Sequence, residues 1–312
     1  MTPSTPSPVN HRTAARDSLR GLTTGDAFGA QFFLPANLPA LRARQLPPAP
    51  WPWTDDTEMA CSVFAALRDR GTIDSAELAQ AFAHHHDFDR GYGASTNRLL
   101  RLIREGGSHR ELAAGVFGGQ GSWGNGAAMR VAPLGAWFAA DPAEAARQAA
   151  RSAEVTHTHP EGVAGAVAVA VAAAWAVRAR TEWLTDADLL AAVLESTPTG
   201  KVREGIAEAR QLLGQQADHV AQVLGNGRYV SAFDTVPFAL WCAAKHLNDY
   251  QWALWTTAGQ GGDIDTTCAI VGGIVAANVG TEGIPARWRA VTEALPQWVA
   301  QQRLGPDVGP AD

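Results

Sequence analysis

The chain has few cysteines, and none of them is paired in the sequence. Cys61, Cys242 and Cys268 are an odd number in 312 residues, and no CxxC motif occurs. This spacing implies no disulfide framework and favours a reducing compartment, so we expect a cytoplasmic protein. Cys61 and Cys268 lie within apolar helical runs and are predicted to be buried small hydrophobic residues.

Excess basic charge and long apolar runs are also missing. The net charge is -6, so the chain lacks the basic face of a general nucleic-acid binder. The uncharged stretch 162–177 is shorter than the roughly 20 residues that a membrane-spanning helix needs. We expect a buried core helix there and no membrane partner. Residues 1–10 lack the apolar segment of a signal peptide.

Strand-like alternation is nearly absent, and helical periodicity dominates. Met59, Val63, Phe64 and Leu67 share one helical face. We predict an all-α fold: a compact single-domain orthogonal bundle of a dozen or more helices over residues 12–303, with disordered tails at 1–11 and 304–312. Helices are expected near 12–30, 55–70, 75–85, 95–105, 127–139, 142–153, 162–180, 186–195, 201–213, 216–224, 235–247, 250–257, 264–279 and 285–301. The Pro-rich stretch 35–52 is predicted to be a surface loop.

Two acidic clusters are the most informative feature. One is Thr54-Asp55-Asp56-Thr57, and the other is Asp263-Ile264-Asp265-Thr266-Thr267. Each opens an apolar helix, where a single cluster would be explained by helix capping. Two matching clusters favour a shared site for hard divalent cations, which take carboxylate and hydroxyl oxygens. Asp26 in the first helix is interpreted as an acceptor that supports the ligands from behind.

A glycine-rich loop between the clusters suits a phosphate. Residues 118–126 contain five glycines, which let backbone N–H groups approach an anion. A helix expected to start near Ala127 would direct its positive end at the phosphate, with Arg130 nearby. Trp123 would either stack on a base or ribose or pack in the core. His157, in Thr156-His157-Thr158-His159, would either bond a ligand or belong to a helix cap.

The ordered set of these motifs resembles the ADP-ribosylglycohydrolase family over roughly residues 14–280. The motifs are Gly25-Asp26-Ala27, Trp53-Thr54-Asp55-Asp56-Thr57, Arg90-Gly91-Tyr92-Gly93, Gly121-Ser122-Trp123-Gly124-Asn125-Gly126, Thr156-His157 and Gly262-Asp263-Ile264-Asp265-Thr266. The resemblance implies an ADP-ribosyl-acceptor hydrolase, with two Mg²⁺ (or Mn²⁺) ions and a compact all-α fold.

The resemblance also assigns roles to the matching residues. It implies metal ligation by Thr54, Asp55, Asp56, Asp263, Asp265 and Thr266, with Asp55, Asp56 and Asp265 as catalytic residues. It implies substrate binding by Gly93, Gly121, Ser122, Trp123, Gly124, Asn125, Gly126 and His157. The expected partners are ADP-ribose and an ADP-ribosylated acceptor, which includes an ADP-ribosylated nucleic acid among the candidate substrates, and the expected state is a monomer.

One stretch departs from the family pattern. Members often carry a Glu soon after the Gly-Asp-Ala-x-Gly segment, whereas this chain reads Gln31-Phe32-Phe33-Leu34-Pro35, with no acid between Asp26 and Asp55. Either the second metal binds more weakly or another acid serves. Two alternatives follow: a module that binds ADP-ribose or a nucleotide without hydrolysis, and a metal hydrolase acting on another phosphorylated metabolite.

Overall fold

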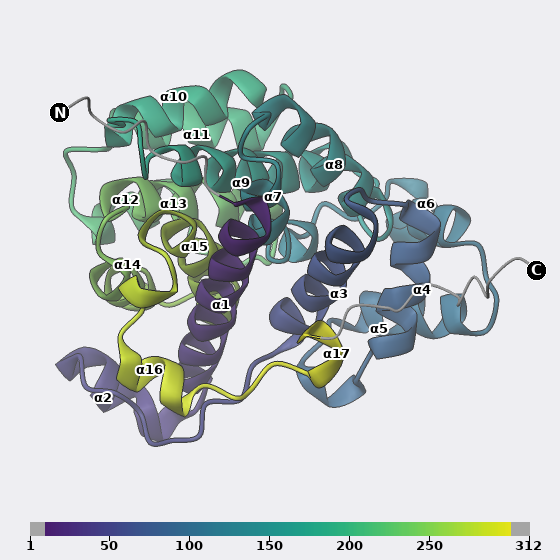
Figure 1. Ribbon diagram of the computed structural model, residues 1–312, viewed down its shortest axis with the longest axis horizontal. Helices are drawn as coiled ribbons and strands as arrows, with labels where there is room; N and C mark the ends of the chain where they lie inside the picture. The colour runs from purple at the N-terminus through teal and green to yellow at the C-terminus, as the bar shows by residue number, and fades with distance from the viewer. Residues whose placement is uncertain (1–9, 301–312) are drawn as a thin grey trace, which may run out of the picture.

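The computed structural model describes residues 10–300 and shows the predicted all-α fold (Figure 1). Within those residues there are seventeen α-helices, five short 3₁₀ helices and no strand. Residues 1–9 and 301–312, which hold most of both predicted tails, lie outside the described residues.

Up to the glycine-rich loop the elements are α1 (His11–Ala30), η1 (Gln31–Phe33), η2 (Pro35–Asn37), α2 (Leu38–Ala43), α3 (Asp55–Arg70), α4 (Ser75–His85), η3 (Phe88–Arg90), α5 (Ala94–Arg104), α6 (His109–Gly119) and η4 (Asn125–Ala127). After it come α7 (Ala132–Trp137), α8 (Pro142–Glu154), α9 (Pro160–Arg178), α10 (Asp186–Ser196), α11 (Lys201–Gln211), α12 (Ala217–Leu224), α13 (Ala232–Lys245), α14 (Tyr250–Ala258), α15 (Ile264–Val279), η5 (Thr281–Gly283), α16 (Ala286–Val291) and α17 (Gln297–Ala300).

Helices α1 and α15 form the centre of the molecule and cross in close contact. Gly21, Gly25 and Gly29 recur every four residues on the face of α1 that meets α15. A Cβ at Gly25 would overlap the carbonyl oxygen of Cys268, and one at Gly29 would lie 2.7 Å from the Cα of Asp265. Only glycine allows this backbone approach. The contact brings Asp26 of α1 beside the acidic start of α15.

Substitution of Gly25 by Ala is expected to lower the free energy of unfolding by about 2–3 kcal/mol, because the added methyl forces the two backbones apart. Urea denaturation would measure this loss. Gly115→Ala in α6 is the matched control, since its Cβ would meet nothing within 4 Å. There the better helix propensity of Ala is expected to leave stability unchanged or raise it by up to about 1 kcal/mol. Equal stability of both variants would contradict close packing at Gly25.

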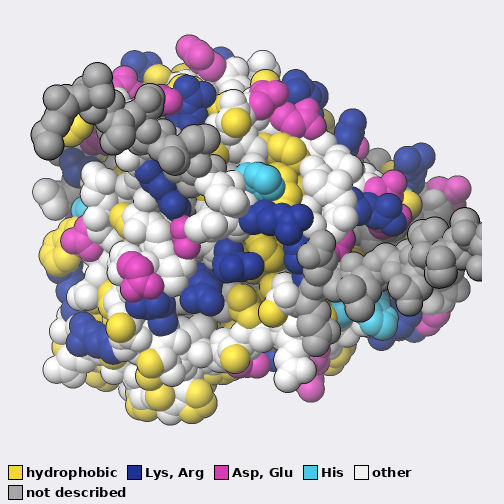
Figure 2. Space-filling view, in the orientation of Figure 1, with side chains coloured by type: hydrophobic (Ala, Val, Ile, Leu, Met, Phe, Trp, Pro, Cys, Tyr) yellow, Lys and Arg dark blue, Asp and Glu magenta, His cyan; other side chains and the backbone are white. Residues whose placement is uncertain are grey.

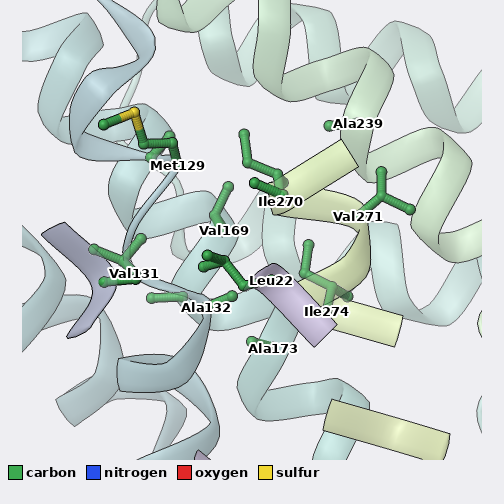
Figure 3. Close-up of a cluster of buried hydrophobic side chains, with 14 of the residues drawn as sticks. Leu22, Met129, Val131, Ala132, Val169, Ala173, Ala239, Ile270, Val271 and Ile274 are labelled. Atoms are coloured by element: carbon green, nitrogen blue, oxygen red, sulfur yellow. The ribbon is translucent and has the colours of Figure 1, made fainter. Parts of the chain in front are cut away.

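The apolar core surrounds this central pair. Figure 3 shows Leu22 of α1 facing Ile270 and Ile274 of α15, with Val169 and Ala173 of α9 beside them. Helix α9 is 19 residues long and apolar enough to cross a membrane, but 78% of its most apolar window is buried inside the fold. It contacts α7, α8, α10 and α15, as the prediction of a core helix requires. All three cysteines are buried, as predicted for Cys61 and Cys268.

Local signals place most helix boundaries correctly. The Asp74 side chain accepts hydrogen bonds from the N–H groups of Ala76 and Glu77 and so caps α4, as predicted. Gly71 ends α3 with φ of 72°, the left-handed conformation that favours glycine.

Three predictions of local structure are wrong, and one helix was missed. The stretch 35–52 contains α2 in addition to loop, and α6 was not predicted. The helix expected over 127–139 is only η4 and the short α7. The chain turns between them, and there the Arg130 side chain donates to the Gly126 carbonyl. The helix expected over 285–301 is broken between α16 and α17, where Glu293 donates its N–H to the carbonyl of Trp51.

Candidate active site

Three helix ends meet at the floor of the site: the C-terminal part of α1 and the starts of α3 and α15. Asp26 accepts hydrogen bonds from the N–H (3.0 Å) and hydroxyl (2.8 Å) of Thr54 and from the N–H (3.1 Å) and hydroxyl (2.5 Å) of Thr57. Asp26 therefore accepts N–H groups that would lack partners at the start of α3, where Thr54 is the cap and Asp55 the first residue. Asp26 lies behind the acidic cluster as predicted.

Asp56 and Asp265 face one another across this floor. One oxygen each from Asp26, Asp56 and Asp265 lies within 4.8 Å of the other two. Asp56 Oδ2 is 3.2 Å from the Thr54 hydroxyl and 3.5 Å from the Thr266 hydroxyl, whereas its buried Oδ1 has no hydrogen-bond partner among residues 10–300. A buried carboxylate oxygen without a donor is costly. A hard cation is the partner that this all-oxygen donor set fits.

Burial raises the pKa values of the clustered carboxyl groups. It raises the pKa of Asp26 to about 6, against four opposing hydrogen bonds. Burial, followed by repulsion from Asp26 and Asp263, raises the pKa of Asp55 to about 8. The pKa values of Asp56 and Asp265 also rise, chiefly through burial and then through neighbouring carboxylates. Protein groups alone therefore leave these charges uncompensated.

A cavity of about 560 Å³ opens above the floor. Its lining includes most of the predicted site residues: Asp55, Asp56, Gly93, Ser122, Trp123, Gly124, Asn125, Gly126, His157, Asp263, Asp265 and Thr266. Thr54 and Gly121 do not line it; the Thr54 hydroxyl bonds Asp26 below, and Gly121 packs against Thr158. Gly91 and Thr96 join Gly93 in one wall, so the 90–93 motif does border the cleft.

The glycine-rich loop forms the opposite wall and is tied to the acidic floor. Asn125 donates from its side chain to Asp263 (2.6 Å) and Thr235 (3.0 Å), so its amide group holds the second acidic cluster in place. Gly124 forms an isolated bridge with Ser231. A helix start near Ala127 was predicted to face the cavity from this loop. That prediction is wrong, because α7 begins only at Ala132. Within the loop, the N–H groups of Gly124 and Asn125 already donate, to the Ser122 hydroxyl (3.2 Å) and the Val230 carbonyl (3.1 Å).

Arg130 also differs from the prediction, because it does not reach the cavity. The side chain is fully buried, and it donates to the carbonyls of Gly126 (3.2 Å) and Ser152 (2.7 Å). Its guanidinium lies over the Phe82 ring, 4.6 Å from the centroid. Burial lowers its pKa to about 9, while Tyr92 and Asp55 oppose the shift. Arg130 thus remains a cation and supports the loop from beneath.

His157 lies against the glycine-rich loop in its neutral form. Burial, with a smaller effect of Arg130, lowers its pKa to about 3. Its Nδ1 is 2.7 Å from the Thr156 hydroxyl, and its Nε2 lies beside Gly124 and Gly126, where an added Cβ would approach it to 3.3 and 3.1 Å. The imidazole therefore presents a hydrogen-bonding nitrogen rather than a charge to this end of the cavity.

The outer rim contains residues that the sequence patterns missed. Phe117 stacks at a tilt on Trp123, with ring centroids 4.8 Å apart, and Tyr229 and Val230 line the same cavity. Val230 has φ of 54°, which is rare for a β-branched residue, and its carbonyl accepts the N–H of Asn125. No motif identifies Phe117, Tyr229 or Val230, since their position depends on loop conformation.

The segment that replaces the acidic loop of the family carries no carboxylate. Phe32 is buried, Phe33 is 52% exposed, and Gln31 is buried with its side chain bonded to the Ala27 carbonyl. None of them lines the cavity. The carboxyl groups that line the cavity therefore come from α3, α15 and the turn before α15, with Asp26 of α1 behind them.

Comparison with known proteins identifies the family of the chain. The family model described as ADP-ribosylglycohydrolase matches residues 7–307, so the chain belongs to the ADP-ribosylglycohydrolase family. It is 30% identical to "ADP-ribosylhydrolase ARH3" of Bos taurus over 276 residues, which cover 77% of this chain and 74% of the relative. An uncharacterized protein of Archaeoglobus fulgidus is 32% identical, with 88% and 89% covered.

The fold has a solved counterpart of the same kind. A chain from an "ADP-ribosylglycohydrolase-related protein complex" superposes with a TM-score of 0.64 at 23% identity, covering 91% of this chain and 96% of that chain. At this identity the likeness concerns the fold alone. Family membership supports an ADP-ribosyl hydrolase activity.

Proposed function

We propose that the protein is a metal-dependent hydrolase that cleaves the glycosidic bond between ADP-ribose and an acceptor, with two Mg²⁺ or Mn²⁺ ions. The observation that carries the metal dependence is the buried, unpartnered Oδ1 of Asp56 among clustered carboxylates. The relatives support the substrate: one is named "ADP-ribosylhydrolase ARH3" and another, from Rhodospirillum rubrum, "ADP-ribosyl-[dinitrogen reductase] glycohydrolase" (26% identical, 75% of this chain and 71% of the relative covered).

The metal ligands in this proposal are Asp55, Asp56, Asp263, Asp265, Thr266 and Thr54. Thr54 has one hydroxyl proton, and the shorter bond to Asp26 uses it. Its lone pairs therefore remain available on the side of Asp56. When bound, such ions orient a substrate oxygen and lower the pKa of a water molecule.

The remaining cavity residues fit the parts of ADP-ribose. The backbone N–H groups of Ser122, Trp123 and Gly126 suit the diphosphate, whereas those of Gly124 and Asn125 already donate within the protein. Neutral His157 would hydrogen-bond to the ligand beside this loop. The paired rings of Phe117 and Trp123 offer an apolar face for the adenine. The distal ribose would then lie over the carboxylates, where Asp55 or Asp56 orients the attacking water or accepts its proton while C1″ gains oxocarbenium character.

The direct test is release of free ADP-ribose from ADP-ribosyl-arginine, ADP-ribosyl-serine and an ADP-ribosylated nucleic acid, each with Mg²⁺, Mn²⁺ or EDTA. Release that requires the metal would establish the hydrolase and name the acceptor. ADP-ribose binding without release from any conjugate would instead identify a non-catalytic binding module.

Removal of divalent cations is expected to make stability depend on pH. The pKa values of Asp26 (about 6) and Asp55 (about 8) exceed the ordinary 3.8. Between about pH 4 and 8 the folded metal-free protein thus binds more protons than the unfolded chain, so its free energy of unfolding falls as pH rises. In EDTA, Tm should be lower at pH 8 than at pH 5.5.

Added Mg²⁺ should reverse this loss, because it binds the ionised carboxylates. At a hundredfold excess over Kd, Tm should rise by roughly 5 °C at pH 8 and by less at pH 5.5. Differential scanning fluorimetry, with Na⁺ at matched ionic strength as the control, measures the shift. An equal Tm with Mg²⁺ and with Na⁺ at both pH values would count against a cation site.

A further inference from the structure

A second cavity, of about 710 Å³, lies on the other side of the turn that carries Asp263. We call it the basic groove; it is formed by α2, the ends of α13 and α14, and the loops 214–218 and 259–261. The residues that carry the argument are Arg42, Arg44, Asp218, Lys245, Trp252 and Gln260. Its volume is within the range of small-molecule sites.

The charge of this groove opposes that of the chain. The protein carries a net charge of -6, yet the groove is lined by three cations, Arg42, Arg44 and Lys245, and one carboxylate, Asp218. Arg42 has no hydrogen bond or ion pair among residues 10–300. Lys245 donates one bond, to the Leu213 carbonyl at 2.9 Å, and keeps two ammonium protons. Figure 2 shows Lys and Arg side chains interspersed with Asp and Glu side chains on the face of the molecule that it draws.

Arg44 adopts an unusual backbone conformation that directs it into the groove. It follows α2 with φ of 51° and ψ of 42°, the left-handed position where glycine is the usual residue. An arginine there costs about 1 kcal/mol or more. Its guanidinium lies 4.4 Å from the centroid of the Trp252 ring, which is 46% exposed. The conformation thus places a cation and an aromatic face together.

The basic groove and the active-site cavity share a wall. Gln260, Gly261 and Ile264 line the groove, whereas Asp263 and Asp265 line the active-site cavity. Asn226 links the two sides, because it donates to the Gln260 carbonyl (2.8 Å) and accepts the N–H of Asp263 (3.2 Å). A ligand in the groove would therefore touch the turn that positions the second acidic cluster.

We propose that the basic groove binds a phosphorylated small molecule of nucleotide size, at a site separate from the active-site cavity. The guanidinium groups of Arg42 and Arg44 and the ammonium group of Lys245 match the oxygens of a diphosphate. The Trp252 face offers a stacking surface, and Gln260 with its neighbouring glutamines offers hydrogen bonds to a base edge. This inference does not rest on the proposed hydrolysis, since it concerns binding to different residues.

Calorimetric titration of the full chain with pyrophosphate and with ADP tests the proposal. In Arg42→Ala/Arg44→Ala the affinity of the basic groove for both probes is expected to fall about tenfold or more, because two charge-assisted contacts disappear. Trp252→Ala should weaken ADP but leave pyrophosphate unchanged. Any binding of either probe in the active-site cavity persists in these variants and is thereby separated.

The matched control is Arg98→Ala/Arg110→Ala, which removes the same charge from exposed helical positions outside the groove. It should bind both probes like the wild type. Equal losses in both double variants would show a general charge effect and overturn the proposal. Absence of pyrophosphate and ADP binding to the wild type, or unchanged binding in Arg42→Ala/Arg44→Ala, would overturn it as well.

Discussion

Replacement of Asp56 by Asn is expected to lower kcat for ADP-ribose release by about 10³-fold while raising the Tm of the metal-free protein. Asn keeps the size of Asp, and its amide oxygen still accepts the bond from the Thr266 hydroxyl. It removes a charge whose pKa is raised by burial and by repulsion from Asp26 and Asp265. The cation loses a ligand, and the apoprotein loses an unfavourable buried charge.

These opposite effects separate catalysis from structural support. A merely structural carboxylate would lower Tm when it is replaced, and activity would fall only as much as the folded fraction. Single-turnover release with Mg²⁺ and thermal unfolding in EDTA measure the two quantities. Asp74→Asn is the control, because Asp74 also starts a helix but is exposed and remote from the cavity, and Asn caps equally well. Wild-type kcat in Asp56→Asn would refute the metal mechanism.

The fold was predictable where local signals and burial agree. The apolar run of α9, the Asp74 cap and the Gly71 stop each place a boundary without knowledge of the partner helix. The break before α17 depends on Trp51, which pairs with this stretch from more than two hundred residues away. No local pattern contains that contact.

The site likewise contains residues that the sequence predicts and residues that it does not. Spacing and residue type identify the two acidic clusters, because their chemistry is carried by the residues themselves. Tyr229 and Val230 were missed because the strained loop conformation brings them to the rim. Arg130 was assigned to the phosphate because a sequence does not reveal which side of a loop a nearby side chain occupies.

That different position of Arg130 leads to the second large effect. Arg130→Lys is expected to lower kcat/KM by about 10²-fold, mainly through KM, because the glycine-rich loop loses its support from beneath. A lysine keeps the charge but cannot bridge the Gly126 and Ser152 carbonyls in the fixed geometry of the guanidinium. One of these two carbonyls is then left without a donor inside the protein, at a cost of about 1–3 kcal/mol in stability.

Arg130→Met distinguishes support of the loop from electrostatic balance. If the hydrogen bonds decide, Met and Lys should raise KM to a similar extent at temperatures where both variants are folded. If the cation itself decides, through its proximity to Asp55, only Met should impair the enzyme, and this outcome would contradict the anchoring role. Arg104→Lys is the matched control, since Arg104 also donates to two backbone carbonyls, those of Ala83 and His86, but lies outside the cavity. Its KM should equal that of the wild type, because neither Ala83 nor His86 lines the cavity.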